Sequence, residues 1–201
     1  MKKIGVFGGT FDPIHLGHLY IAYEAKRKLG LDKIIFMPSG NPPHKQLKKV
    51  TDSSYRYKMV EASIKDYQGF EVSDYEVKKE TLSYTFKTLE YLKSLYEDSE
   101  IYFITGGDCL IDLETWSNVP RILELCKFVV FNRPGHSKEE FLKQKRIIEN
   151  KYDKEILYLH LLTLEISSTM IRERVKENLS VEFFVSKDVS DMIKKFKLYK
   201  G

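Results

Sequence analysis

The sequence predicts an α/β protein with a Rossmann-like, doubly wound parallel sheet, in strand order 3-2-1-4-5 with a further C-terminal strand and helices. Two observations support this prediction. Short runs rich in Val, Ile and Phe alternate along the chain with longer segments of helical period. The first of these runs leads straight into a glycine turn and a helix start, so the chain opens with a β–α–β unit. Such alternation is typical of a parallel sheet that is covered by helices on both faces.

The first half of the chain is expected to form alternating strands and helices. Residues 3–7 are an apolar run typical of a buried strand, and the helical segment 16–29 ends at Gly30, a residue that favours a helix C-terminus. Pro42 and Pro43 mark a loop after the second strand. The expected strands are 3–7, 33–37 and 70–77, and the expected helices are 16–29, 53–67 and 83–96.

The second half continues this alternation. We expect strands at 101–105, 128–131 and 155–162, helices at 120–125 and 138–152, and two closing helices. No internal repeat, low-complexity tract or linker interrupts the pattern, so a single domain is expected over residues 1–201. The Lys-rich segment 40–51 and the charged segment 134–140 are expected to be the most mobile.

Composition and charge limit the classes of function. The chain is 42% hydrophobic and 31% charged, which indicates a folded protein. Its net charge of +4 is too small to indicate nucleic acid or a membrane as the main partner. No apolar run approaches the roughly 20 residues needed to cross a bilayer. The apolar run after Met1 is soon broken by Gly8 and Gly9, which argues against an export signal. We therefore expect a cytoplasmic protein with an anionic small substrate and free thiols at Cys109 and Cys126.

A glycine turn followed by two histidines is the first candidate site. Gly8, Gly9 and Thr10 follow the first strand, and glycine there lets backbone N–H groups approach a polyphosphate beside the positive end of a helix. The spacing is neither the dinucleotide-binding G-x-G-x-x-G nor the Walker loop. His15 and His18 share the first helical turn, so both side chains point to the same side and can donate hydrogen bonds to phosphate. The alternative is that one imidazole caps the turn and the other packs.

A second glycine turn follows the fourth expected strand. In the predicted order, the first and fourth strands are neighbours at the switch point, where ligands bind in doubly wound sheets. Gly106, Gly107 and Asp108 are therefore expected to flank the same crevice as the first turn. Trp116, the only tryptophan, lies a few residues further on, and core packing would be its ordinary role.

Three later segments each have a functional and a structural interpretation. The segment 166–172, Ile-Ser-Ser-Thr-Met-Ile-Arg, begins a helix after an apolar strand; its Ser and Thr residues are ordinary caps, and Arg172 is either a phosphate ligand or a surface charge. Lys45 is either a mobile cation for a substrate phosphate or a solvated loop charge. Ser83 and Thr85 open the helix 83–96 and can cap it without any other function.

These segments together resemble one superfamily. The segment 8–18, Gly-Gly-Thr-Phe-Asp-Pro-Ile-His-Leu-Gly-His, is similar to the signature of the H-x-G-H nucleotidylyltransferases. The Phe-Asp-Pro at 11–13 narrows the resemblance to the bacterial nicotinate mononucleotide adenylyltransferases, since phosphopantetheine adenylyltransferases typically carry Thr where His15 stands. The segments 42–45, 83–85, 106–108 and 166–172 agree with that narrower family. Gly107 is a departure, because the family usually shows Gly-Ala-Asp at 106–108.

The resemblance implies an enzyme that transfers the adenylyl group of ATP to nicotinate mononucleotide, giving deamido-NAD and pyrophosphate in NAD biosynthesis. Attack on the α-phosphate would be direct and in line, with Mg²⁺ arriving with ATP and no dedicated metal site. The implied catalytic residues are His15, His18 and Arg172; the implied ATP-binding residues are Gly8, Gly9, Thr10, Phe11, Gly106, Asp108, Ser168 and Thr169; the implied mononucleotide-binding residues are His44, Lys45, Tyr84, Thr85, Trp116 and Arg133. Stacking of Trp116 on the nicotinate ring belongs to this implication.

Two other functions stay open on the sequence. A cytidylyltransferase or phosphopantetheine adenylyltransferase is disfavoured by residues 83–85 and Trp116, and a non-catalytic nucleotide sensor is disfavoured by the presence of both histidines and Arg172. An RNA-binding protein would need a large basic patch with interleaved aromatic residues, which the chain lacks. The expected partners are ATP and nicotinate mononucleotide, without nucleic acid or membrane, and a homo-oligomer is left open.

Overall fold

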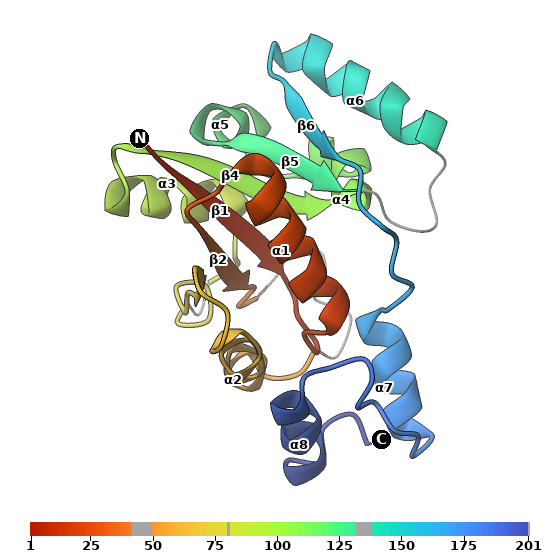
Figure 1. Ribbon diagram of the computed structural model, residues 1–201. Helices are drawn as coiled ribbons and strands as arrows, with labels where there is room; N and C mark the ends of the chain where they lie inside the picture. Colours follow the sequence, from red (N-terminus) through yellow and green to blue (C-terminus); the bar gives the residue numbers. More distant parts are fainter. Residues whose placement is uncertain (42–49, 80, 132–137, 201) are drawn as a thin grey trace.

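The computed structural model describes residues 1–41, 50–79, 81–131 and 138–200, and its centre is a six-stranded sheet (Figure 1). The strands lie in the order β3-β2-β1-β4-β5-β6, which confirms the predicted order and places the further strand beside β5. All neighbouring strands are parallel. The strands are β1 (Lys2–Gly9), β2 (Lys33–Pro38), β3 (Phe70–Val72), β4 (Ser99–Gly106), β5 (Lys127–Phe131) and β6 (Ile156–Leu159).

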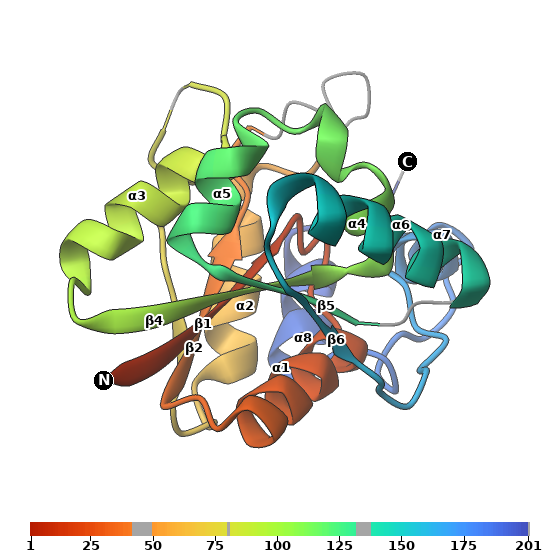
Figure 2. The ribbon, with the colours of Figure 1, turned by 90° about the horizontal axis from the view of Figure 1, so that it is seen from above.

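Helices cover both faces of the sheet (Figure 2). They are α1 (Leu16–Leu29), α2 (Ser53–Ile64), α3 (Thr85–Leu95), α4 (Gly107–Ile111), the 3-10 helix η2 (Leu113–Thr115), α5 (Val119–Leu125), α6 (Lys138–Tyr152), α7 (Ser168–Lys176) and α8 (Lys187–Lys195). One apolar core contains residues of α1, α2, α7 and α8, and the other contains residues of α3 to α6. In β4, Ile101 and Phe103 enter one core whereas Tyr102 and Ile104 enter the other, because successive strand residues face opposite sides.

The local sequence explains the position of α1, which carries the first candidate site at its start. Leu19, Ala22 and Ala25 are buried at helical spacing, so the helix lies flat on the sheet. Gly30 has a left-handed φ of 62°, and its N–H donates to the Lys26 carbonyl. The helix therefore ends at the predicted residue.

Two predicted elements in the first half are shorter in the structure. The strand expected over 70–77 is confined to Phe70–Val72, which pairs with the edge of β2 before the chain turns and buries Glu76. The helix expected over 53–67 ends at Ile64, because the Tyr67 N–H donates to the Ile64 carbonyl in a turn and Gly69, with a φ of 79°, reverses the chain.

The second half differs from the prediction in two places. β6 stops at Leu159 rather than 162, because the Leu162 N–H donates to the Tyr20 hydroxyl of α1, at 3.1 Å, instead of to a strand. α4 and η2 were not predicted, since elements of this length contain too little periodic pattern to detect. Most of the two segments expected to be mobile, 42–49 and 134–137, lies outside the described residues. Within the described part of the chain, no helix is long and apolar enough to cross a bilayer.

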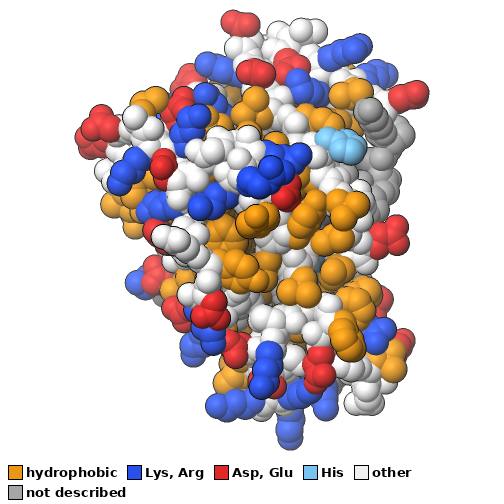
Figure 3. Space-filling view, viewed as in Figure 1, with side chains coloured by type: hydrophobic (Ala, Val, Ile, Leu, Met, Phe, Trp, Pro, Cys, Tyr) orange, Lys and Arg blue, Asp and Glu red, His pale blue; other side chains and the backbone are white. Residues whose placement is uncertain are grey.

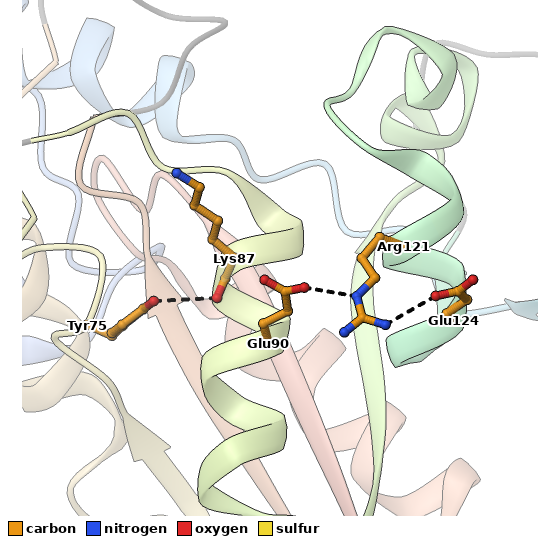
Figure 4. A network of polar contacts seen from close by, with 5 residues as sticks. All are labelled: Tyr75, Lys87, Glu90, Arg121 and Glu124. Atoms are coloured by element: carbon orange, nitrogen blue, oxygen red, sulfur yellow. Dashed lines mark hydrogen bonds and ion pairs between the residues drawn. The ribbon is translucent and has the colours of Figure 1, made fainter.

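Exposed ion pairs join α3 to α5 (Figure 4). Arg121 contacts Glu90 through Nε at 2.9 Å and Glu124 through Nη1 at 3.2 Å. All three side chains are open to solvent, where such pairs contribute little to stability. The apolar contacts between these helices and the sheet are the larger contribution to their packing.

Candidate active site

The two glycine turns open into one cleft at the carboxyl edge of the sheet, where β1 and β4 lie side by side. The cleft has a volume of about 920 Å³. Its lining includes Gly8, Gly9, Thr10, Phe11, His15, His18, Gly106, Asp108, Trp116, Ser168, Thr169 and Arg172. The fold therefore brings the expected ATP-binding and catalytic residues together from distant parts of the chain, at the switch point where the strand order predicts a ligand site.

One side of the cleft is the extended connection between β6 and α7. Leu162 and Leu164 line the cleft there, and their side chains are 70% and 37% exposed. Hydrophobic side chains gather on this face of the molecule, over α1 and the connection (Figure 3). An apolar wall beside polar glycine turns suits a flat base whose phosphates extend towards the turns.

Phe11 closes the first glycine turn from the inside. Its φ is +49°, in the left-handed region, and its buried ring meets Phe7 and His18 edge-on, at centroid distances of 5.6 and 5.0 Å. A Cβ atom at Gly9 would lie only 2.8 Å from this ring. Gly9 is thus needed for packing as well as for the backbone access that the sequence suggested.

His15 and His18 stack on each other at the start of α1, with ring centroids 3.6 Å apart. The backbone N–H of His15 donates to Nδ1 of His18 at 3.2 Å. Because Nδ1 accepts this bond, the proton of a neutral His18 ring must be on Nε2, which is then a donor. The capping interpretation therefore accounts for Nδ1 of His18, and the donor of the ring is Nε2.

Arg172 joins the last motif to the first. Its Nη1 donates to the Asp12 carbonyl at 2.7 Å and its Nη2 to the Thr169 hydroxyl at 3.1 Å, while the Ser168 hydroxyl donates to the Pro13 carbonyl at 2.9 Å. The expected cap is confirmed at Ser167, whose side chain accepts from the Met170 N–H. Arg172 is therefore not an isolated surface charge, and a guanidinium with five donors keeps others for a ligand.

The second glycine turn leads directly from β4 into α4. A Cβ atom at Gly107 would lie 3.2 Å from Cδ2 of Phe141, which is tight, and this contact gives a reason for glycine where the family usually has Ala. Trp116 meets Phe103 and Phe128 edge-on, each at 6.2 Å between ring centroids, and also lines the cleft. It thus packs on the core and still presents part of its ring to the cleft.

The start of α3 differs from the sequence expectation. The N-cap is Tyr84 and no side chain caps the helix, so the expected capping by Ser83 and Thr85 is wrong. The Ser83 hydroxyl instead accepts from the Asn41 N–H at 3.4 Å, and the Ser83 N–H donates to the Asn41 carbonyl at 3.0 Å. These two bonds hold the helix start beside the exit of β2. Within the described residues, the N–H groups of Thr85 and Phe86 have no acceptor, and neither Tyr84 nor Thr85 lines the cleft. His44, Lys45 and Arg133 lie outside the described residues.

Comparison with known proteins agrees with this geometry. The family model described as cytidylyltransferase-like matches residues 6–174. A Clostridium perfringens (strain 13) protein named "Probable nicotinate-nucleotide adenylyltransferase" is 54% identical over 200 residues, covering 100% of this chain and 99% of that protein. A protein of the same name from Clostridium botulinum (strain Eklund 17B) is 56% identical with the same coverage. The chain belongs to the nicotinate-nucleotide adenylyltransferase family.

Solved structures of proteins with related names share the fold of this family member. The Plasmodium falciparum nicotinic acid mononucleotide adenylyltransferase complexed with NaAD has a TM-score of 0.77 at 18% identity, covering 99% of this chain and 98% of that one. The same protein complexed with APC has a TM-score of 0.75 with the same identity and coverage. At this identity the similarity supports the fold alone.

Arg56 supports the site of this adenylyltransferase-family chain and was missed by the sequence analysis. Its side chain is 1% exposed and donates to backbone carbonyls of Thr10 at 2.7 Å, Ser39 at 2.6 Å and Thr51 at 2.8 Å. Burial lowers the pKa of the guanidinium, and the nearby Asp12 carboxylate opposes this shift. Arg56 therefore fastens the first glycine turn to the exit of β2 and to the segment before α2.

A signal for Arg56 does exist in the sequence. The buried residues of α2 are Arg56, Met59, Val60, Ser63 and Ile64, which follow the spacing of one helical face. An arginine on an apolar stripe indicates a buried cation that must have dedicated acceptors.

Glu76 is a second buried ionisable residue beside the site. It is 8% exposed, and the Thr88 hydroxyl donates to its Oε1 at 2.7 Å. Burial raises the pKa of its carboxyl group, while hydrogen bonds from Thr88, Ser83 and the Gly40 N–H oppose the increase. Glu76 thus ties the start of α3 to the exit of β2, and no local pattern in the sequence marks it.

The described residues offer few ligands for a metal ion. No group of three or more His, Cys, Asp or Glu among them lies close enough to hold one. The acidic residues in the lining of the cleft are Asp12, Asp108, Asp112 and Glu165, of which Asp108 and Asp112 lie in α4 and at its C-cap. A divalent cation would fit here only if most of its ligands came from elsewhere, such as phosphate oxygens and water.

Proposed function

We propose that this chain transfers the adenylyl group of ATP to nicotinate mononucleotide, giving nicotinate adenine dinucleotide (deamido-NAD) and pyrophosphate, as a step of NAD biosynthesis in the cytoplasm. The observation that carries the proposal is the junction of the first and last motifs. The contact between Arg172 and Asp12 places a guanidinium on the same cleft as His15 and His18. The names of the clostridial relatives support the choice of substrates.

The proposed reaction is a direct displacement at the α-phosphorus of ATP. An oxygen of the mononucleotide phosphate forms the new bond to phosphorus, and the bond to the oxygen bridging the α- and β-phosphates breaks as pyrophosphate leaves. The Nε2–H of His18 donates to the α-phosphate as charge develops on it, and His15 and Arg172 hold the polyphosphate. The N–H groups of Gly8 to Thr10 form the cradle.

Mg²⁺ fits this scheme as a partner of ATP. Bound to the phosphates, it would neutralise charge and ease departure of pyrophosphate. Asp108 is the cleft carboxylate on the second glycine turn, beside Gly106, and we assign both to the ATP side. Ser168 and Thr169 act at the start of α7, where helix N–H groups also favour an anion.

The start of α3 suits the carboxylate of nicotinate. The N–H groups of Thr85 and Phe86, which have no acceptor among the described residues, lie at the positive end of the helix dipole. Tyr84, the N-cap of α3, and Trp116, which lines the cleft, are the candidates for contact with the ring, and His44, Lys45 and Arg133 remain candidates for the mononucleotide phosphate.

One assay separates this proposal from the alternatives. Pyrophosphate release from ATP is measured with nicotinate mononucleotide, nicotinamide mononucleotide and phosphopantetheine in turn, and from CTP with a phosphorylated alcohol. Turnover that depends on a pyridine mononucleotide supports the proposal. Turnover only with another acceptor would support a different nucleotidylyltransferase, and binding of ATP without any turnover would support a nucleotide sensor.

We expect kcat/KM to be higher for nicotinate than for nicotinamide mononucleotide by at least about a hundredfold. The carboxylate accepts hydrogen bonds from the N–H groups at the start of α3, whereas the NH₂ of an amide would face those donors and leave them unmatched. The ratio is measured at saturating ATP and Mg²⁺. Equal values, or a preference for the amide, would overturn the substrate assignment and leave adenylyl transfer standing.

The variant Thr85→Pro tests which group makes this choice. Thr85 is the first helical residue, where proline is tolerated, and Tyr84 before it is already extended, with φ −104° and ψ 128°. The change therefore removes one N–H with little disturbance and should reduce the preference for the acid. Thr85→Ala keeps the N–H and is the matched control. Trp116→Ala should weaken both substrates alike, because stacking does not distinguish acid from amide.

We expect Arg172→Lys to lower kcat/KM by about ten- to a hundredfold, the value of one or two charged hydrogen bonds. A lysine cannot hold Asp12 and Thr169 and still present a planar fork to phosphate. The control is Arg174→Lys on the same helix, whose side chain donates to the Ser180 carbonyl outside the cleft. Full activity of Arg172→Lys would show that Arg172 has only a structural role.

A further inference from the structure

Asp12 is the junction at which three separate parts of the chain meet the first glycine turn. Its Oδ1 accepts from the Tyr199 hydroxyl at 2.8 Å, and its Oδ2 accepts from the Thr51 N–H at 3.3 Å. Its backbone carbonyl accepts from Arg172, as described above. The side chain of Asp12 is 6% exposed, so its carboxylate depends on these protein donors rather than on water.

The turn that Asp12 follows is strained. Phe11 has a φ of +49°, a region that costs a non-glycine residue free energy, so the turn keeps this shape only if its neighbours hold it. Arg56 holds the carbonyl of Thr10 on one side of Phe11, and the bonds to Asp12 hold the other side. The ring of Phe11 in turn contacts His18. Displacement of Asp12 would therefore shift the side chains of both His18 and Arg172.

Tyr199 is brought to this junction by an unusual backbone path. Lys197 and Tyr199 both have left-handed φ angles, 51° and 65°, in the segment that follows α8. The ring of Tyr199 packs against the core, which leaves its hydroxyl directed at Asp12. Burial and the adjacent Asp12 carboxylate raise the pKa of Tyr199 well above its usual value, so the hydroxyl stays protonated and donates.

We propose that Tyr199 is a positioning residue for phosphate chemistry in this protein. Its hydroxyl holds the Asp12 carboxylate. Through Asp12 it fixes the position of Arg172 and the shape of the strained turn, which leads into His15 and His18. Tyr199 does not line the cleft, so it acts through these residues rather than on substrate. The expected effect on turnover rests on the proposed function. The expected effect on the conformation of the glycine turn does not depend on it.

Tyr199→Phe is the direct test, because it removes one hydroxyl and keeps the ring. We expect kcat to fall about tenfold with the KM for ATP within about threefold, since the loss is in alignment rather than in ground-state binding. The matched control is Tyr102→Phe. Tyr102 is also a buried tyrosine whose hydroxyl donates to a carboxylate, that of Glu100 at 3.3 Å, but it does not line the cleft. We expect its kcat to be unchanged.

Amide hydrogen exchange provides a readout that does not need turnover. In Tyr199→Phe, we expect peptides covering 8–18 and 50–56 to exchange about tenfold faster than in the unmodified protein, because the Thr51 N–H and the strained turn lose their support. The same peptides should be unaffected in Tyr102→Phe. Unchanged exchange in Tyr199→Phe overturns the proposal, whatever its effect on turnover.

The double variant Tyr199→Phe with Arg172→Lys shows whether the two residues act together. If Tyr199 acts through Asp12 on Arg172, the double variant should lie within about twofold of Arg172→Lys alone. A further tenfold loss would mean that the residues act independently and would overturn the route proposed here. If the unmodified protein fails to adenylylate any mononucleotide, the proposed function is wrong, and hydrogen exchange then decides the positioning role by itself.

Discussion

His18→Ala is expected to lower kcat for adenylyl transfer by about a thousandfold while leaving the dissociation constant for ATP within about tenfold. The reason lies in how the ring is held. Nδ1 of His18 accepts from the His15 backbone at 3.2 Å, which directs the ring and makes Nε2 the donor. A donor aimed at charge that develops on the α-phosphate acts mainly in the transition state, so its loss appears in kcat rather than in binding.

The measurement combines steady-state kinetics with calorimetric titration of a non-hydrolysable ATP analogue. His160→Ala is the matched control, because His160 is exposed and does not line the cleft. His18→Gln should recover part of the lost rate, since its amide nitrogen can take the place of Nε2. A folded His18→Ala protein with kcat within threefold of the unmodified enzyme would remove His18 from the mechanism.

Arg56→Ala is expected to reduce the free energy of unfolding by about 3–5 kcal/mol. The substitution leaves carbonyl oxygens of Thr10, Ser39 and Thr51 without their donor in a buried site, and it also leaves a cavity. For a chain of this size the loss corresponds to a decrease in Tm of about 10 °C. The free energy of unfolding of Arg56→Lys should lie between that of Arg56→Ala and that of the unmodified protein, because one ammonium group cannot contact all of the same carbonyls.

The control for Arg56 is Arg121→Ala. Arg121 also makes two contacts through its guanidinium, to Glu90 and Glu124, but it lies on the surface between α3 and α5 (Figure 4). Its replacement should leave Tm nearly unchanged. Equal Tm values for both variants, measured by calorimetry under the same conditions, would show that the Arg56 contacts do not stabilise the fold as argued.

Local sequence signals predicted the parts of the structure that depend on neighbouring residues. α1 ends before Gly30 because glycine adopts the left-handed conformation without strain, and α7 starts after Ser167 because the Ser167 side chain accepts from an N–H of the first turn. The alternation of apolar runs and helical segments predicted a parallel sheet, which the structure confirms. Each of these features has a pattern that is contained within a few consecutive residues.

The predictions that failed depended on contacts with other parts of the chain. β3 is short because it lies at the edge of the sheet and the chain turns to bury Glu76. α3 is not capped by Ser83, because the Ser83 hydroxyl accepts from the Asn41 N–H instead. Residue types that favour a strand or a helix cap were present in the sequence at both places. In the structure, tertiary contacts use the hydrogen-bonding groups that the strand or the cap would have needed.

The sequence by itself therefore determined the fold class, the positions of most elements and the family to which the chain belongs. Only the tertiary structure decided how the site is supported: Arg56 beneath the glycine turn, Arg172 on the Asp12 carbonyl, and Tyr199 on the Asp12 carboxylate. The physical reason is that a periodic pattern or a cap is encoded by residues one or two turns apart. A hydrogen bond between residues 12 and 199 exists only because the segment after α8 packs against the core beside the first glycine turn, and no local pattern in the sequence shows that these two side chains will meet.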